Sequence, residues 1–218
     1  MRENSSMESP SGAAGSDEID WNTRYLSGET PWDHGEAHPE LVHWLTENPF
    51  PGEVIVPGCG KGYDVRAIAS SGVSALGVDI SPEAVKAAKQ IGPTQGAHFQ
   101  VADVLNSPQE WRHRFQGAFE HTCYCAIPPA ARPTYATFLA TILRPGGVFL
   151  ACFYIDPETD GVGPPFPTHR KELDRLFHPY FRLQQEWVPS HTYPNRKGRE
   201  LFRQYIRNGV EASQSFSS

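Results

Sequence analysis

The sequence predicts an α/β domain built on a doubly wound, mostly parallel sheet of about seven strands. Strand-like and helix-like segments alternate from residue 53 to residue 104, which is typical of βαβ units with right-handed crossovers. A glycine-rich turn at 58–62 follows the first strand, at the edge of such a sheet where ligands bind. The length of 218 residues suits one globular domain and is short for two.

The alternating unit contains three strands separated by two helices. The second helix has the clearest start, because Ser81 suits an N-cap, Pro82 the first helical position and Glu83 the first turn. Gly92 suits its C-terminal end. The predicted strands are 53–58, 73–79 and 97–104, and the predicted helices are 63–72 and 81–92.

The second half of the chain completes the sheet. Arg144-Pro145-Gly146-Gly147 is read as a turn between a helix and the fifth strand. The pattern predicts strands at 115–123, 148–154, 181–188 and 200–206, and helices at 132–143 and 171–177.

The ends of the chain differ in composition from the sheet. Residues 1–18 are rich in Ser, Gly, Ala and Glu, so we expect a disordered tail. Residues 211–218 are interpreted in the same way. A short helix is expected from Pro39 to about Asn48, where apolar side chains recur at helical spacing (Leu41, Trp44 and Leu45).

Charge and hydropathy exclude two classes of partner. Nineteen Lys and Arg against 25 Asp and Glu give a net charge of -6, and such a field repels phosphate backbones. We therefore expect no nucleic-acid partner. No window approaches the 18 or so apolar residues of a membrane span, so no membrane partner is expected either.

The four cysteines indicate free thiols. No apolar leader segment precedes them, which favours a reducing, cytoplasmic location. No second Cys or His pair follows Cys123 and Cys125 at zinc-like spacing, so no metal is predicted. The cysteines are Cys59, Cys123, Cys125 and Cys152.

The glycine-rich turn predicts a nucleoside cofactor without a pyrophosphate. Its spacing, Gly-x-Gly-x-Gly at 58–62, differs from the dinucleotide fingerprint and from the P-loop. Asp79 ends the second strand 21 residues after Gly58, close to the position of a ribose-binding carboxylate. Asp103 is placed to bind an adenine amino group, with Val104 against the ring. S-adenosylmethionine meets these requirements, although an ordinary tight turn with solvated strand ends is the alternative.

At this point the sequence resembles the thiopurine and thiol S-methyltransferase family, whose plant members also methylate halide and thiocyanate. The motifs that carry the resemblance run in order through residues 20 to 205. They are Trp21-x-x-Arg24-Tyr25, Gly28-Glu29-Thr30-Pro31-Trp32-Asp33-x-Gly35, Val56-Pro57-Gly58-Cys59-Gly60, Asp79-Ile80-Ser81, Cys125-Ala126-Ile127-x-Pro129-x-x-Arg132-Pro133 and Gly163-Pro164-Pro165-Phe166.

The resemblance implies a Rossmann-like fold of the class I methyltransferase type, with S-adenosylmethionine as cofactor and S-adenosylhomocysteine as product. It implies one methyltransferase domain at 19–210 with an N-terminal lid at 19–48. Tyr25 stands where Trp is common in the family, and Glu120 where Asp is common. The implied cofactor contacts are Trp21, Tyr25 and Trp32 from the lid, and Gly58, Gly60, Asp79, Ile80, Asp103, Val104 and Glu120 around the cofactor.

Methyl transfer to sulfur requires a thiolate aligned with a sulfonium methyl group in a dry pocket. An aromatic lid provides dryness and attracts the cation through its ring faces; anchoring of the N-terminal segment is the alternative role. Arg132 is the candidate to draw an anionic acceptor or to pair with the cofactor carboxylate, and Tyr124 to orient the acceptor. His34 and His121 stay open as general bases, whereas His38 and His43 are interpreted as exposed helix residues.

The sequence therefore predicts an enzyme that methylates the sulfur of a small thiol or soft anion. The acceptors considered are sulfide, methanethiol, an aromatic thiol, halide and thiocyanate, and a monomer is expected. Three alternatives remain. The first is a small-molecule O- or N-methyltransferase, for which Ile127-Pro128-Pro129-Ala130 loosely resembles a motif of amino-group methyltransferases but lacks its polar and aromatic ends. A catalytically silent cofactor-binding regulator and a nicotinamide-dependent oxidoreductase are the others, and the loop spacing disfavours the oxidoreductase.

Overall fold

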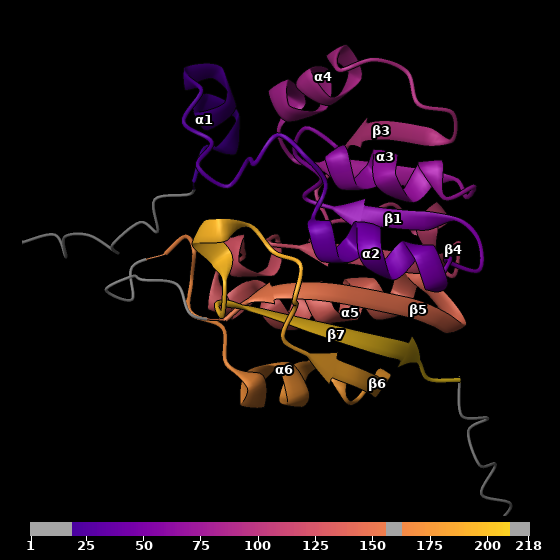
Figure 1. The fold of residues 1–218 in the computed structure, drawn as a ribbon. Helices are drawn as coiled ribbons and strands as arrows, with labels where there is room; N and C mark the ends of the chain where they lie inside the picture. The colour runs from indigo at the N-terminus through magenta and orange to yellow at the C-terminus, as the bar shows by residue number, and fades with distance from the viewer. Residues whose placement is uncertain (1–18, 156–162, 210–218) are drawn as a thin grey trace, which may run out of the picture.

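The computed structural model describes residues 19–155 and 163–209. The two predicted tails lie outside these residues. Within them, a seven-stranded sheet has the order β3-β2-β1-β4-β5-β7-β6, as Figure 1 shows. The strands are β1 (Val54–Pro57), β2 (Ala75–Asp79), β3 (Ala97–Val101), β4 (Phe115–His121), β5 (Leu143–Tyr154), β6 (Phe181–Trp187) and β7 (Glu200–Arg207).

The sheet direction confirms the predicted class. Strands β1 to β5 pair in parallel, and β7 pairs antiparallel with both β5 and β6. The order reverses at β1, whose neighbours are β2 and β4. In such a sheet this reversal opens a crevice at the carboxyl ends of the strands.

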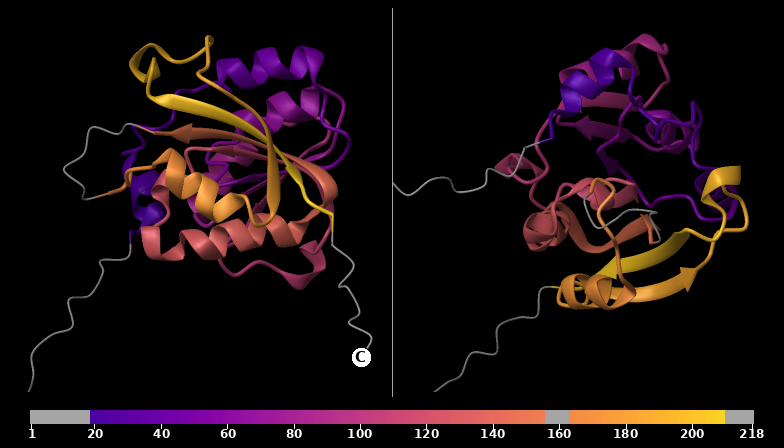
Figure 2. Two further views of the ribbon diagram at one scale, coloured as in Figure 1. Left: turned by 90° about the horizontal axis from the view of Figure 1, so that it is seen from below. Right: turned by 90° about the vertical axis from the view of Figure 1, so that its left-hand side faces the viewer.

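Helices cover both faces of the sheet (Figure 2). They are α1 (Trp21–Ser27), α2 (Pro39–Glu47), α3 (Tyr63–Ser70), α4 (Pro82–Gln90), α5 (Arg132–Ile142) and α6 (Arg170–Phe177). Four short 3-10 turns occur at Gln109–Trp111, Tyr124–Ala126, Pro129–Ala131 and Pro194–Arg196. No helix in the described ranges has the length and apolar character of a membrane span.

Alternation along each strand divides the core into two clusters. Val54 and Val56 pack with apolar residues of α2 and α3 on one face. Ile55 points to the opposite face and joins residues of α5 and α6. Because successive side chains of a strand point to opposite faces, the fully buried β1 needs apolar residues at every position. Its burial on both faces fixes the end of β1, where the glycine-rich turn begins.

Helix α1 was not predicted from the sequence. Asp20 caps it by accepting a hydrogen bond from the Thr23 amide at 3.0 Å, and Gly28 ends it with φ of 76°. None of its residues is buried, so it lacks the apolar stripe that identifies a core-facing helix. Asn22 attaches it to the start of α4, where Oδ1 accepts from Ser81 Oγ and from the Glu83 amide, each at 3.0 Å.

The predicted turn at residues 144–147 is wrong as a boundary, because these residues lie inside β5. Leu143 pairs with Phe115, and the next pair is Val148 with Gly117. Between these pairs one residue of β4 lies opposite four of β5, so the Pro-Gly-Gly segment forms a bulge in a continuous strand. The Pro-Gly-Gly segment does interrupt the pairing with β4, but the pairing resumes at Val148, so β5 continues through it.

Candidate functional site

The glycine-rich turn lies at the carboxyl end of β1, and its backbone conformation requires glycine at positions that include 58 and 60. Gly58 and Gly60 have φ of 59° and 52°, in the left-handed region that favours glycine. A Cβ on Gly58 would lie 2.9 Å from Cys123 Sγ, and one on Gly60 would lie 2.8 Å from Tyr25 Oη. The turn therefore admits close neighbours on both sides, which suits a ligand approaching the backbone.

Asp79 ends β2 and connects this turn to α4. Its Oδ2 accepts from the Gly60 amide and its Oδ1 from the Ser81 amide, both at 2.9 Å. Burial raises the pKa of the carboxyl group, although these backbone donors oppose the shift. Each oxygen retains acceptor capacity for a further donor such as a hydroxyl. The structure thus places Asp79 directly beside the turn, as the sequence predicted.

The third strand end contributes Asp103 and Val104, which lie just beyond β3. Asp103 Oδ1 accepts from the Leu105 amide at 2.8 Å and stabilises the turn there. Val104 is partly buried against the core. Ile80, after β2, is 51% exposed and offers an apolar surface at the same edge of the sheet. The three strand ends are therefore adjacent, because β3, β2 and β1 are consecutive in the sheet.

The predicted lid aromatics form one cluster over the glycine-rich turn. Trp32 contacts Trp21 edge-on at 5.4 Å between ring centroids and Tyr25 at 5.9 Å. Its Nε1 donates to Tyr25 Oη at 3.2 Å. Burial, and secondarily the charge of Asp79, raises the pKa of Tyr25, so this hydroxyl stays protonated. These three aromatic residues precede α2 in the chain, and their cluster lies next to the carboxyl end of β1.

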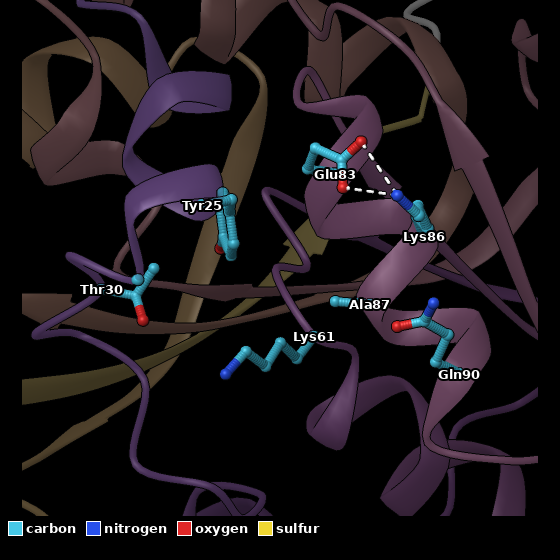
Figure 3. A pocket seen from close by; sticks show the side chains of 8 residues that line it. Tyr25, Thr30, Lys61, Glu83, Lys86, Ala87 and Gln90 are labelled. Carbon is cyan, nitrogen blue, oxygen red and sulfur yellow. Dashed lines mark hydrogen bonds and ion pairs between the residues drawn. The ribbon is translucent and has the colours of Figure 1, made fainter.

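A cavity of about 320 Å³ separates the N-terminal segment from α4. Figure 3 shows Tyr25 and Thr30 on one side, α4 on the other, and Lys61 between them. Lys61 Nζ pairs with Asp33 Oδ2 at 2.5 Å, which connects the turn to the segment between α1 and α2. The lining residues are Tyr25, Gly28, Thr30, Lys61, Glu83, Lys86, Ala87 and Gln90.

A second, smaller cavity of about 60 Å³ extends from the same turn toward β4. Tyr25 and Lys61 line both cavities. On its far side the wall comes from the end of β4 and from the β6–β7 connection. Its lining includes Trp32, Asp33, His34, Glu36, Gly58, Gly60, Asp64, His121, Thr122 and Tyr193.

Glu120 lies within β4 and is completely buried. Its Oε1 accepts from the Tyr124 amide at 2.8 Å, whereas Oε2 has no hydrogen-bond partner among the described residues. Burial raises the pKa of the carboxyl group to about 7, although the Tyr124 amide opposes the shift. The Glu120 side chain therefore holds the backbone at Tyr124, just after β4. Its expected contact with the cofactor stays a prediction.

Arg132 is buried, with 1% of its surface exposed. Nη1 donates to Glu172 Oε2 at 2.7 Å and to the Pro167 carbonyl at 2.9 Å. The guanidinium also lies 4.4 Å from the ring centroid of Tyr124, which is itself 1% exposed. These contacts fasten the segment before α6 to the start of α5 and neutralise the charge of Arg132. Roles for Arg132 and Tyr124 toward an acceptor stay predictions.

Sequence reasoning left His121 open and missed Asp64. His121 Nδ1 lies 2.8 Å from Asp64 Oδ2, and the two residues are separated by 57 positions in the chain. Burial lowers the pKa of His121, but the charge and hydrogen bond of Asp64 outweigh it and raise the pKa overall. No spacing rule reveals this pair, because it depends on β4 lying beside β1.

His38 is buried, so its interpretation as an exposed helix residue was wrong, while His43 is exposed as expected. Among the described residues, His38, His121, Cys152 and Glu200 place potential metal ligands within 4.8 Å of one another. His38 Nδ1, however, accepts from the Glu40 amide at 3.1 Å. The neutral ring then carries its proton on Nε2, which lies 3.1 Å from Glu200 Oε2. This arrangement is an internal hydrogen bond, and it occupies the nitrogen that a metal would need.

Comparison with known proteins gives a consistent family. The model of the family described as thiopurine S-methyltransferase matches residues 16–210. Thiocyanate methyltransferase 1 of Arabidopsis thaliana is 34% identical over 186 residues, which are 83% of this chain and 81% of that protein. Probable thiol methyltransferase 2 of the same plant is 33% identical over 162 residues, 73% of this chain and 71% of that protein.

The fold also matches solved structures. The 1,6-didemethyltoxoflavin-N1-methyltransferase of Burkholderia thailandensis, solved with 1,6-didemethyltoxoflavin and S-adenosylhomocysteine, superposes with a TM-score of 0.66. Its sequence identity is 23%, and the match covers 87% of this chain and 86% of that one. At this identity the similarity concerns the fold, which is the Rossmann-like class I methyltransferase fold.

Proposed function

The chain belongs to the thiopurine S-methyltransferase family and is an S-adenosylmethionine-dependent S-methyltransferase, and we propose from this premise that its acceptor is a small thiol bound beneath the aromatic cluster. The observation that carries the proposal is the position of Trp21, Tyr25 and Trp32 over the glycine-rich turn. A water-poor, apolar cover suits a reaction in which a thiolate and a sulfonium cancel their charges.

The residues around the turn fit an adenosine that carries no phosphate. Glycine at positions 58 and 60 leaves the space that a Cβ would fill, and Asp79 provides carboxylate oxygens beside it. We assign Asp79 to the ribose hydroxyls, Asp103 to the adenine amino group, and Ile80 and Val104 to the ring faces. When bound, S-adenosylmethionine supplies an electrophilic methyl group. The protein's own residues orient the acceptor and exclude water.

The larger cavity meets the smaller one at Tyr25 and Lys61. The smaller cavity is lined by Gly58 and Gly60, which we assign to the cofactor, so a compact acceptor in it would lie directly beside the cofactor. A volume of about 60 Å³ favours sulfide, methanethiol or another short thiol over an extended acceptor. An aromatic thiol would require the lid to open further.

A panel of acceptors tests this proposal directly. Purified protein is incubated with S-adenosylmethionine and with sulfide, methanethiol, an aromatic thiol, thiocyanate, iodide, a phenol or an amine. Release of S-adenosylhomocysteine is measured in each case. We expect the highest kcat/KM with short thiols. Turnover accelerated by the phenol or the amine, and by no sulfur compound, would contradict the proposed acceptor class.

The expectations about oligomeric state, location and partners are also part of the proposal. We propose a small-molecule acceptor, a monomeric enzyme and a cytoplasmic location, with no nucleic-acid partner. The net charge of -6 supports the last point, because an acidic protein repels phosphate backbones. Light scattering during gel filtration checks the monomer, for which the expected mass is 24.2 kDa.

A further inference from the structure

We propose that His121, oriented by Asp64, is the general base that removes the proton from a neutral thiol acceptor in the smaller cavity. This inference rests on the proposed function and adds the proton acceptor and the protonation state of the substrate. His121 would be a catalytic residue, and Asp64 a positioning residue that acts through it.

The position of the pair fits this role. His121 ends β4, and Asp64 lies in the first turn of α3, directly after the glycine-rich turn. Both side chains line the smaller cavity together with Gly58 and Gly60. Their exposures of 12% and 16% leave them accessible from the cavity and otherwise enclosed. A thiol in this cavity would therefore lie between the imidazole and the glycine-rich turn.

The hydrogen bonds of Asp64 determine which nitrogen of His121 is basic. Asp64 Oδ1 accepts from the His38 amide at 2.8 Å, so its carboxylate is held on one side by the backbone. Oδ2 then receives the proton of His121 Nδ1 at 2.8 Å. The neutral ring consequently has its lone pair on Nε2. Within the described ranges no residue forms a hydrogen bond with this nitrogen.

Aromatic contacts hold the ring in place. His121 stacks with Tyr193 at 6.2 Å and 18°, and it meets the ring of His38 at 4.8 Å and 89°. A base whose orientation is fixed by a carboxylate and by packing follows the arrangement of nucleophile-activating pairs in other enzymes.

The charges around His121 favour its protonated form after it has accepted a proton. Asp64 is the nearest and forms the hydrogen bond, and burial works against it. The titratable groups that face His121 from the packed elements are Asp64 of α3, His34 and His38 before α2, Glu120 of β4, Cys152 of β5, Tyr193 of the β6–β7 connection and Glu200 of β7. A base made stronger in this way suits a thiol that is mostly protonated at neutral pH, as the cysteine side chain is with a pKa of about 8.5.

The same charges select against acceptors that enter as anions. Asp33, Glu36 and Asp64 all line the cavity, and Lys61 is already paired with Asp33. Arg132 is likewise paired with Glu172. These carboxylates do not repel an uncharged thiol, whereas they repel thiocyanate and iodide. We therefore expect neutral thiols to be preferred over permanent anions.

The proposed step balances in protons and electrons. Nε2 of His121 takes the S–H proton, and the thiolate uses its freed electron pair to form a bond to the methyl carbon. The bond from that carbon to the sulfonium sulfur breaks, and its electron pair neutralises the sulfur. The proton on His121 is then released to water. No oxidant, reductant or metal is required.

The other histidine of the cavity lacks the supporting groups. His34 stacks on Tyr193 at 3.7 Å, and burial lowers its pKa. In the part of the chain that the structure describes, no carboxylate forms a hydrogen bond with it. His34 is therefore a wall of the cavity, and His121 is the candidate base.

The test uses the pH dependence of kcat/KM in wild type, His121→Asn and Asp64→Asn. With an alkyl thiol, wild type should show a bell whose acidic limb reports His121 and whose alkaline limb reports the thiol. His121→Asn should lose about 10²-fold or more, and its rate should rise until the thiol itself is ionised. With an acidic aromatic thiol, which ionises without help, the loss should fall below about tenfold.

Asp64→Asn should lower kcat/KM and move the acidic limb to lower pH. Binding of S-adenosylhomocysteine by calorimetry, together with the melting temperature, shows that each variant is folded. If His121→Asn does not fold, the limb shift in Asp64→Asn decides the question. His178→Asn is the matched control, since His178 pairs with Asp174 at 3.6 Å on the exposed end of α6, and its profile should match wild type.

Two outcomes would overturn the inference. In one, His121→Asn lowers the rate equally for the alkyl thiol, the aromatic thiol and thiocyanate, which indicates a structural role. In the other, its pH profile is the same as that of wild type. Failure of the proposed function looks different, because wild type itself would then methylate no sulfur acceptor while still binding S-adenosylhomocysteine.

Discussion

At the scale of single residues, Asp79 holds the glycine-rich turn and faces the proposed ribose position. We expect Asp79→Ala to weaken S-adenosylhomocysteine binding by about 1 to 3 kcal/mol, because a hydrogen-bond acceptor for two hydroxyls is lost. Calorimetry measures this as an increase in Kd of about 5- to 150-fold. Asp103→Ala, measured in parallel, tests the proposed adenine contact independently of the ribose contact. An unchanged Kd in Asp79→Ala would remove the residue from the site.

Glu120 gives a prediction about stability and pH. Its pKa is about 7 in the folded protein against the ordinary 4.5, so the folded state binds its proton more tightly than the unfolded state does. The stability from this group is complete below about pH 4.5 and is lost as the pH rises through about 7. The pKa difference limits the effect to the order of 3 kcal/mol.

Glu120→Gln should remove this dependence, because the amide keeps an oxygen for the Tyr124 amide and cannot ionise. The free energy of unfolding from denaturant titrations, variant minus wild type, should increase between pH 4.5 and pH 8. Subtracting wild type removes the titration of groups that do not interact with Glu120. If this difference in unfolding free energy does not change with pH, Glu120 has the same protonation state in the folded and the unfolded protein, and the prediction is wrong.

At the scale of elements, α1 is attached to the rest of the protein by few contacts. It has no buried residue, and Asn22 joins it to the N-terminus of α4 through two hydrogen bonds. Helix α1 is therefore a weakly docked element whose opening leaves the core intact, as expected for segments that admit ligands.

Asn22→Ala should loosen α1 without changing global stability. Tryptic cleavage after Arg24 should become faster, and the KM for S-adenosylmethionine should rise, while the melting temperature changes little. Ser27→Ala is the control, since Ser27 Oγ donates within α1, to the Arg24 carbonyl at 3.2 Å. Equal cleavage rates for wild type and Asn22→Ala would mean that Asn22 does not secure α1.

At the scale of the whole molecule, the proposed site joins parts of the chain that fold as one sheet. Lid residues, the glycine-rich turn and the ends of β2 and β3 all meet there, so a ligand that binds them stabilises the folded state. S-adenosylhomocysteine at 100 times its Kd should add about 2.7 kcal/mol. For a domain of this size the melting temperature should rise by about 5 to 10 °C, measured by fluorescence or calorimetry. No rise would contradict the assigned site.

Local chemistry explains why much of this protein was predictable. The capping residues around Ser81, the buried run of β1 and the glycine spacing at 58–62 act within a few positions of one another, and the structure has them as expected. Asp79 was also found beside the glycine-rich turn. The exceptions are instructive: α1 has no apolar stripe to signal it, and the Pro-Gly-Gly signal produced a bulge because pairing with β4 continued.

The sequence by itself determined the sheet class, the glycine-rich turn and the family, since each depends on residues that are near one another in the chain or in a fixed order. Only the tertiary structure decided that Arg132 is paired with Glu172 and that His121 is paired with Asp64. These pairs are 40 and 57 positions apart. Their contact depends on strand order and register, which no local pattern of side chains specifies.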